Sequence, residues 1–263
     1  MPAAPRLFDA HLHPERLRDV DLQTLHHFGV RRALLVGRAV EEPGPDALRA
    51  QLEALVSEEL PRLQRCGIDA RLAVGVHPRS VPRRGLQAVL DLLPAAFDHR
   101  RVVALGEIGL HQGGPAEEEA VVEQLLLARR LRVPVLVHTP ERDKERHTRR
   151  LLALLRSHGP PAERVLVDHV SARTLPLVLG CGHWAGLTVQ LGALRAERAV
   201  ALVAQRGSER LVLNSDAGDR AGDLLALPRA VHLLAKAGLS DRVVRRVAWG
   251  NATTFLGLAG ARS

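Results

Sequence analysis

Short runs of apolar residues alternate with longer amphipathic segments along almost the whole chain. Each short run is apolar throughout and is flanked by turn-forming residues, a pattern typical of strands buried on both faces of a parallel sheet. The pattern predicts eight strands, at residues 7–10, 33–37, 71–76, 102–106, 134–137, 165–167, 184–189 and 211–213.

The segments between these strands carry apolar residues at helical spacing. Residues 117–131 begin with a glutamate cluster, which the dipole of a helix favours in its first turn. Further helices are expected at residues 46–64, 148–158, 197–205 and 225–236. Strand–helix alternation without a linker or repeat predicts one α/β domain over residues 1–263. Eight such alternations in this length fit a single closed (β/α)8 TIM barrel better than an open sheet.

Composition places the chain among ordinary globular proteins, because 46% of its residues are hydrophobic and 25% are charged. No apolar run approaches the roughly 20 residues of a membrane-spanning helix. The opening residues lack the apolar region of a signal peptide, so we expect a cytoplasmic protein with no membrane partner. Cys66 and Cys181 lie too far apart for a disulfide framework or a zinc ribbon, and are expected to be small buried residues.

The formal net charge of +8 comes almost entirely from arginine, since Lys144 and Lys236 are the only lysines. A positive field suits anionic partners such as DNA or a phosphorylated small molecule. The arginines are scattered through the predicted helices, however, and the chain has only two Trp, four Phe and no Tyr. A base-stacking surface of the single-strand-binding kind is therefore not expected, and charge alone does not identify the partner.

Ionisable residues follow or end most of the predicted strands. In a barrel of parallel strands, these positions share the end where active sites are built. Such side chains are costly to bury unless they are paired or bind a metal. The residues concerned are His11, His13, Glu107, His138, His169 and Asp216.

The first two of these residues, His11 and His13, are two positions apart on a strand and therefore point to the same face. Imidazole and carboxylate ligands together suit zinc, manganese, iron or nickel better than calcium, and magnesium stays open as well. Six ligands are too many for one tetrahedral zinc and suit two divalent cations that share a carboxylate. The alternative, in which each histidine is buried and satisfied by backbone carbonyls, is reasonable for one residue but not for the whole set.

With these residues in place, the sequence resembles the TatD family of metal-dependent hydrolases, within the amidohydrolase-like barrels. The similarity is carried by FDAHLH at 8–13, GVHP at 75–78, ALGEIGL at 104–110, PVLVHTP at 134–140, His169, LNSDA at 213–217 and GNATTFLGL at 250–258. The resemblance implies a (β/α)8 barrel with two metals, one held by His11, His13 and Asp216 and the other by His138 and His169. Glu107 would bridge the two ions.

Three positions depart from the family pattern. His111 stands where an acidic residue is usual, residues 168–172 read DHVSA in place of an HCFSG-like stretch, and residues 214–219 read NSDAGD in place of ETDAP. Asp216 directly follows the apolar strand and is the preferred ligand, with Asp219 as the alternative. The departures leave the predicted metal ligands intact but change their surroundings, so they bear on the substrate more than on the hydrolytic chemistry.

Two cations that share a water would lower its pKa and make it a nucleophile. Asp216 would then accept or orient the proton of that water, in addition to binding metal, and Glu107 would hold the ions together. His77 and His111 are candidate substrate contacts, with structural roles as the alternative. Arg142, in the loop at 139–147, is a candidate anion contact, whereas Lys144 and Arg146 are more typical of a solvated helix start.

The resemblance favours phosphoester hydrolysis, including 3′–5′ exonuclease activity on DNA. A second hypothesis is a small-molecule amidohydrolase, lactonase or phosphatase on the same barrel. A third is a metal-binding scaffold without catalysis, which the complete ligand set argues against. The sequence specifies neither the metal nor the oligomeric state.

Overall fold

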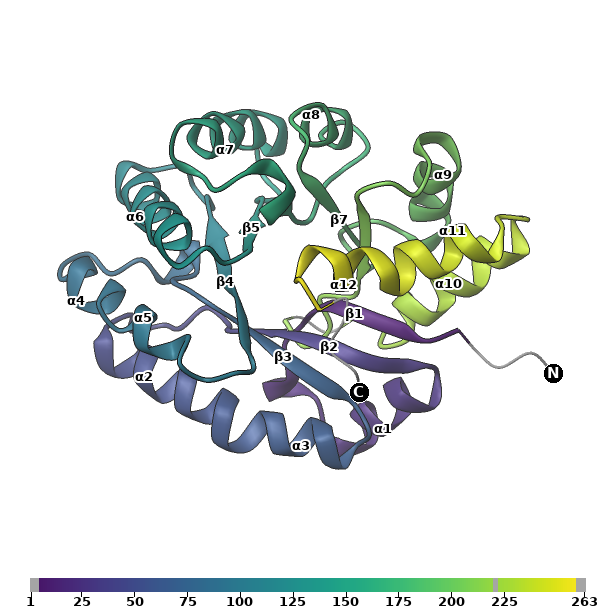
Figure 1. Ribbon diagram of the computed structural model, residues 1–263, viewed down its shortest axis with the longest axis horizontal. Helices are drawn as coiled ribbons and strands as arrows, with labels where there is room; N and C mark the ends of the chain where they lie inside the picture. Colours follow the sequence, from purple (N-terminus) through teal and green to yellow (C-terminus); the bar gives the residue numbers. More distant parts are fainter. Residues whose placement is uncertain (1–4, 220–221, 259–263) are drawn as a thin grey trace.

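The computed structural model describes residues 5–219 and 222–258 of the chain. Its eight strands are parallel and form one sheet, in which each strand pairs with the next along the chain. The strands are β1 (Leu7–Leu12), β2 (Val30–Val36), β3 (Asp69–Val74), β4 (Val102–Gly109), β5 (Val135–His138), β6 (Val165–Val167), β7 (Trp184–Thr188) and β8 (Leu211–Asn214). Helices surround the strands (Figure 1), so the predicted single (β/α)8 TIM barrel is confirmed.

The helices follow the predicted amphipathic segments, with shorter ones added between them. The predicted helix at 46–64 is a continuous run of α2 (Pro45–Ala54), a π-helical turn at Leu55–Glu59 and α3 (Leu60–Arg65). The others are α1 (Asp19–His27), α4 (Leu86–Leu90), α5 (Leu93–Ala96), α6 (Pro115–Leu131), α7 (Lys144–His158), α8 (Leu175–Gly180), α9 (Ala196–Arg206), α10 (Ala226–Lys236), α11 (Asp241–Arg245) and α12 (Asn251–Phe255). A second π-helical turn, Arg246–Gly250, connects α11 to α12.

The barrel closes where the first and last strands meet. Leu12 forms a parallel bridge with Ala217, just beyond β8. The N–H of Asp216 donates to the carbonyl of His11 at 3.0 Å, and the N–H of His13 donates to the carbonyl of Ala217 at 2.9 Å. Closure therefore brings the segment after β8 directly against the HxH motif of β1.

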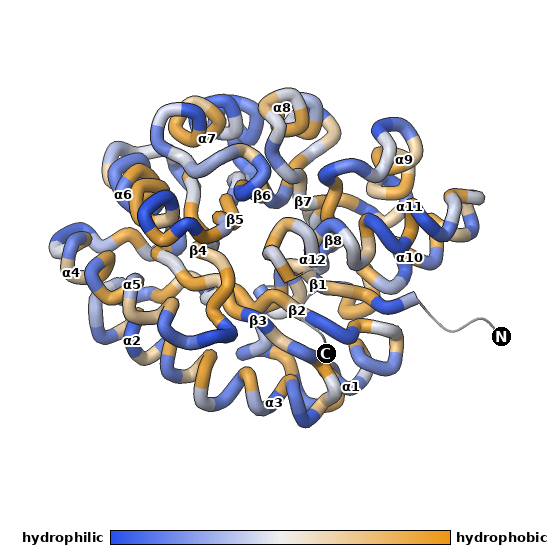
Figure 2. The backbone as a smooth tube through the Cα atoms, in the orientation of Figure 1, coloured by the Kyte–Doolittle hydropathy of each residue, from blue (hydrophilic) through white to orange (hydrophobic). Residues whose placement is uncertain are grey.

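Apolar side chains fill both the barrel interior and the layer between strands and helices. Figure 2 shows the hydrophobic colours concentrated on the strands and on parts of the surrounding helices. One cluster of buried side chains includes Phe8, Leu34, Leu136, Leu166 and Val212, which are all fully buried, and also Phe255 of α12. The interior is thus a packed core, which leaves one end of the barrel for polar side chains.

Two expectations from composition have a structural counterpart. Within the described ranges, none of the helices combines the length and the hydropathy that crossing a lipid bilayer requires. Cys66 is buried as expected, but Cys181 is exposed, because it lies just past the end of α8 where the chain turns back toward β7. Neither cysteine forms a disulfide.

Candidate metal centre

Six ionisable side chains meet at the end of the barrel where the strands finish. His11, Glu107 and His138 belong to β1, β4 and β5, whereas the other three lie within two residues of a strand end. All but His11, which is fully buried, line a pocket of about 730 Å³. The parallel barrel therefore brings together the six residues named from the sequence, which also include His13, His169 and Asp216.

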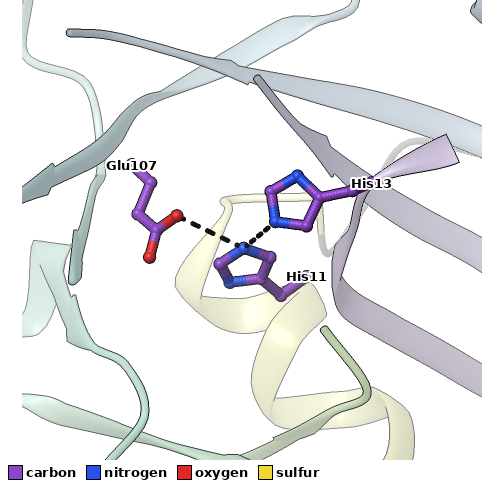
Figure 3. Close-up of side chains that lie close together, drawn as sticks. All are labelled: His11, His13 and Glu107. Carbon is purple, nitrogen blue, oxygen red and sulfur yellow. Dashed lines mark hydrogen bonds and ion pairs between the residues drawn. The ribbon is translucent and has the colours of Figure 1, made fainter. Parts of the chain in front are cut away.

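His11 and His13 face each other, with their Nε2 atoms 3.0 Å apart (Figure 3). The Nδ1–H of His11 donates to Oδ2 of Asp168 at 2.7 Å, and that of His13 donates to the carbonyl of Val36 at 2.9 Å. In their neutral forms, both rings therefore turn the lone pair of Nε2 toward the other ring, an arrangement that a shared cation stabilises. Nitrogen ligands about 2.0–2.1 Å from one ion lie about 3.3–3.4 Å apart in a tetrahedral site and about 2.8–3.0 Å apart at the right angles of an octahedral one, so this separation is close to that of two ligands of one cation.

Glu107 lies between the histidines of different strands. Its Oε1 is 2.6 Å from Nδ1 of His138 and 2.9 Å from Nε2 of His169. Its Oε2 is 3.5 Å from Nε2 of His11 and 3.6 Å from Nε2 of His77. Because the two oxygens face different histidines, this one carboxylate can contact cations on either side of it.

One ring nitrogen in the site has no hydrogen-bond partner among the residues that the structure describes. Nε2 of His138 is buried and makes no hydrogen bond to any described residue, while Nδ1 of the same ring contacts Glu107. Buried polar atoms are nearly always paired. An unpaired imidazole nitrogen beside a carboxylate fits a metal ligand.

Asp216, rather than Asp219, lies against the histidine pair. Its Oδ1 is 3.2 Å from Nε2 of His13 and 3.6 Å from Nε2 of His11. Asp219 also lines the pocket, but its Oδ1 is 3.4 Å from Nη2 of Arg79. Of the two candidates after β8, Asp216 is therefore the one positioned to share a cation with His11 and His13.

The charges of the site depend strongly on one another. Burial alone lowers the pKa of His11, but the carboxylates around it, led by Glu107, outweigh burial and raise that pKa to about 10. Without a metal the ring therefore carries a second proton, on Nε2 beside His13, which a bound cation would displace. Burial opposes the ionisation of Glu107, yet His11 and His138 hold its pKa well below the usual value. Burial opposes the ionisation of Asp216 as well, but its contact with His13 and the charges of His11 and His169 lower its pKa. These carboxylates stay ionised at neutral pH and create a field that favours a bound cation.

The ligand atoms form three overlapping groups, and the atoms within each group lie within 4.8 Å of one another. The groups are His11, His13 and Glu107; His11, Asp168 and His169; and His77, Glu107 and His138. Imidazole nitrogens and carboxylate oxygens are the ligands of zinc, manganese, iron and nickel sites. The converging lone pairs, the unpaired nitrogen and the donor types agree. The site therefore fits divalent metal ions.

His77 differs from the other histidines in its hydrogen bonding. The backbone N–H of Arg79 donates to Nδ1 of His77 at 3.0 Å, so the proton of the neutral ring is on Nε2. Burial lowers the pKa of His77 to about 3, which keeps the ring neutral. His77 therefore directs an N–H donor toward the pocket. This arrangement fits the predicted substrate contact better than a metal ligand.

The two other predicted substrate contacts lie on loops around the pocket. His111 follows β4, and its ring centroid is 6.3 Å from that of His138. Its loop is held by Glu117, whose Oε2 accepts the backbone N–H of His111 at 2.7 Å and of Gly113 at 2.9 Å. Arg142 is exposed on the loop before α7 and lines the same pocket, whereas Arg146 does not line it.

Two polar residues of the site have roles that the sequence did not predict. Asp168 is fully buried behind His11, and Lys144 is largely buried at the start of α7. Nζ of Lys144 donates to the carbonyl of His169 at 2.7 Å, and burial lowers its pKa to about 8. A helix does begin at Lys144, as predicted, but the prediction that this residue is solvated is wrong, because its ammonium group ties the loop after β5 to the segment after β6. For Asp168, the available signal was its position at a strand end beside His169.

Comparison with known proteins agrees with this geometry. The family model described as TatD related DNase matches residues 8–236. An uncharacterised metal-dependent hydrolase from Methanocaldococcus jannaschii is 27% identical over 250 residues, which cover 95% of this chain and 99% of that protein.

Solved structures give the same result. A TatD-like protein from Archaeoglobus fulgidus is 32% identical, with a TM-score of 0.80 over 95% of this chain and 99% of that one. The phosphotriesterase homology protein of Escherichia coli, solved with phosphate in its active site, shares the fold at 18% identity. Its TM-score is 0.74 over 96% of this chain and 99% of that one. The chain belongs to the TatD-related DNase family of metal-dependent hydrolases.

Proposed function

We propose that this chain hydrolyses phosphoester bonds at a site that holds two divalent cations. The observation that carries the proposal is the position of Glu107, whose two oxygens face different histidines. On one side lie His11, His13 and Asp216, and on the other lie His138 and His169. Glu107 would thus bridge the two ions, whose identity among zinc, manganese, magnesium, iron and nickel the donor atoms leave open.

The chemistry divides between the cations and the side chains. Bound cations would polarise the oxygen under attack and lower the pKa of a water molecule so that it becomes a nucleophile. Asp216 stays ionised, and its side chain is 19% exposed at the pocket, so its carboxylate can accept the proton of the attacking water. His77 donates its Nε2–H to an oxygen of the substrate, where negative charge develops in the transition state.

A phosphoester is favoured as substrate by two arginines that line the pocket. Arg142 lines it from the loop before α7, and Arg79 lines it from the loop after β3. A guanidinium group binds phosphate oxygens in a two-pronged geometry. DNA with a free 3′ end and phosphorylated small molecules both offer such a group, and the family assignment favours DNA.

A second candidate is a small-molecule amide or lactone. Among the described residues that line the pocket, the only aromatic rings are histidines, so no Phe or Trp is available there to stack on a base. Apolar side chains of the segment after β7, led by Leu191 and Leu194, line it as well. These features favour a compact substrate that is enclosed on several sides.

A single set of assays separates the candidates. The purified protein is supplied with magnesium or manganese and incubated with 3′-labelled single-stranded DNA, and in parallel with phosphomonoesters, amides and lactones. Glu107→Ala removes the carboxylate between the histidines, and Glu119→Ala, on the exposed face of α6, is the matched control. Cleavage of DNA by the wild type and Glu119→Ala but not by Glu107→Ala is expected. Metal-bound protein that cleaves only an amide or lactone would overturn the phosphoester assignment.

A further inference from the structure

The side of the His11 ring that faces away from His13 is occupied by a buried carboxylate. Oδ2 of Asp168 accepts the Nδ1–H of His11 at 2.7 Å, and both side chains are 0% exposed. Asp168 is absent from the lining of the pocket, so it contacts the site through His11 and not through the substrate. Because Nδ1 of His11 donates to Asp168, Nε2 is the nitrogen left to bind a cation in the pocket once its own proton has been displaced.

The same carboxylate reaches a histidine of the other side through Thr188. The hydroxyl of Thr188 donates to Oδ1 of Asp168 at 3.2 Å, which uses its only proton. Nδ1 of His169 lies 2.9 Å from that hydroxyl oxygen, so the ring must be the donor there. Nε2 of His169 is consequently left to face Glu107, at 2.9 Å from Oε1.

The surroundings of Asp168 provide both space and donors for an ionised carboxylate. Oδ1 also accepts the amide Nδ2–H of Asn214 at 2.8 Å and the backbone N–H of His169 at 2.8 Å. A Cβ atom at Gly186 of β7 would overlap Oδ1 of Asp168, so the absence of a side chain there makes room for the carboxylate.

We propose that Asp168 is a positioning residue that fixes the tautomer and orientation of one histidine in each half of the metal centre, directly at His11 and through Thr188 at His169. The proposal rests on the proposed function in that it takes the two histidines to serve different cations. Neither Asp168 nor Thr188 touches a cation or the substrate in this assignment. Residues of this kind alter metal affinity by about 10- to 100-fold when they are replaced.

Substitutions separate the two connections of Asp168. Thr188→Val keeps the shape of the side chain but removes the acceptor for His169, whereas Thr188→Ser restores a hydroxyl. Asp168→Asn places an amide N–H either against the Nδ1–H of His11 or against the three donors around Oδ1. Thr148→Val is the matched control, because Thr148 is a fully buried threonine in α7 whose hydroxyl donates to the carbonyl of Lys144, outside this network.

The test is titration of metal-free protein with Co²⁺, followed by visible absorption and by metal analysis after gel filtration. Wild type and Thr148→Val should bind alike. Thr188→Val should weaken one binding step by about 10- to 100-fold and change its absorption band, and Thr188→Ser should restore both. Asp168→Asn should weaken both steps. Far-ultraviolet circular dichroism and thermal unfolding identify any variant that fails to fold. If Asp168→Asn fails to fold, the comparison of Thr188→Val with Thr188→Ser tests the proposal.

The outcomes distinguish the two proposals. Unchanged Co²⁺ affinity and spectra in folded Thr188→Val and Asp168→Asn would overturn the positioning role while leaving the proposed function standing. If the variants show the expected changes in Co²⁺ binding but the wild type hydrolyses no phosphoester, the substrate assignment would be overturned and the positioning role supported. A loss of affinity in Thr148→Val equal to that in Thr188→Val would also contradict the proposal, because the effect would then be general destabilisation.

Discussion

Ser215 donates its hydroxyl proton to Oδ2 of Asp9 at 2.5 Å, which ties the end of β8 to β1 inside the closed barrel. The backbone N–H of Ser215 also donates to Oδ1 of Asp9, at 2.9 Å. Both residues are 0% exposed, and burial raises the pKa of Asp9 to about 6 although these hydrogen bonds oppose the shift. The carboxylate of Asp9, two residues before His11, thus depends on Ser215 for two of its hydrogen bonds.

Ser215→Ala should therefore lower the free energy of unfolding by about 1–3 kcal/mol, because a buried acceptor loses its partner. Urea denaturation of the metal-free protein, followed by circular dichroism, measures this difference. Ser157→Ala, on an exposed part of α7, is the control and should change the free energy of unfolding by less than about 0.5 kcal/mol. Equal stability of the two variants would show that the β1–β8 contact does not depend on this hydroxyl.

His77→Ala should lower kcat by about 10²- to 10³-fold, as expected when one donor to a developing negative charge is lost. Metal content should be unchanged, because Nδ1 of His77 is occupied by the N–H of Arg79 and Nε2 carries the proton. His77→Gln retains an N–H donor and should recover part of the rate. Loss of a metal ion from His77→Ala, measured by elemental analysis, would instead make His77 a ligand.

Arg142→Ala should raise KM for an anionic substrate while leaving kcat nearly unchanged, since Arg142 lines the pocket from an exposed loop. One charge-assisted hydrogen bond contributes about 1.5–3 kcal/mol, so the expected increase is roughly 10- to 100-fold. Arg146→Ala is matched in residue type and exposure but lies outside the pocket lining. An equal change in both variants would point to the general positive field rather than to a contact.

The strands and the meeting of the six polar residues were predictable because both follow from local rules. Strands buried on both faces are apolar throughout, and side chains at the ends of parallel strands share one end of a barrel. The prediction was less accurate where polar residues enter a strand. The predicted strand at 33–37 begins earlier, since β2 (Val30–Val36) includes Arg32, whose guanidinium carbon lies 5.1 Å from the ring centre of Trp249 and whose Nε donates to Asp69.

Residues that act through others were harder to find. Asp168 pairs with a histidine 157 positions away, and its remaining donors come from β7, β8 and its own chain neighbour. Lys144 was predicted to be solvated because charged residues surround it in the sequence, yet its ammonium group donates to backbone carbonyls. Such partners are specified by the closed barrel and not by spacing along the chain.

Removing metal should destabilise the protein. The ionised Glu107 and Asp216 lie beside histidine nitrogens that present lone pairs, so a cation should bind the folded state far better than the unfolded chain. Metal at about 100 times its dissociation constant adds about 2.7 kcal/mol to the free energy of unfolding. Thermal unfolding with a chelator, and again after metal is restored, measures the effect. Glu107→Gln should respond much less, and a wild type indifferent to chelation would contradict the metal centre.

A histidine at the opposite end of the barrel should make stability depend on pH. His183 precedes β7, is 5% exposed and donates from Nδ1 to the carbonyl of Ala162. Burial, aided by Arg210, lowers its pKa below the value of 6.5 that applies to the unfolded chain. Near and below pH 6.5 the unfolded chain therefore binds a proton that folded His183 does not. The free energy of unfolding consequently decreases as the pH falls from above 6.5 toward the lower pKa of the folded protein.

His183→Asn keeps an N–H donor for Ala162 but cannot be protonated, so its stability should fall less than that of the wild type between pH 8 and pH 5.5. Urea denaturation across this range measures the difference, and His232→Asn, at an exposed position in α10, controls for the loss of a histidine. The remaining histidines, including those of the metal centre, contribute equally to all three proteins. Parallel stability curves for the wild type and His183→Asn would therefore show that His183 is protonated as readily in the folded protein as in the unfolded chain.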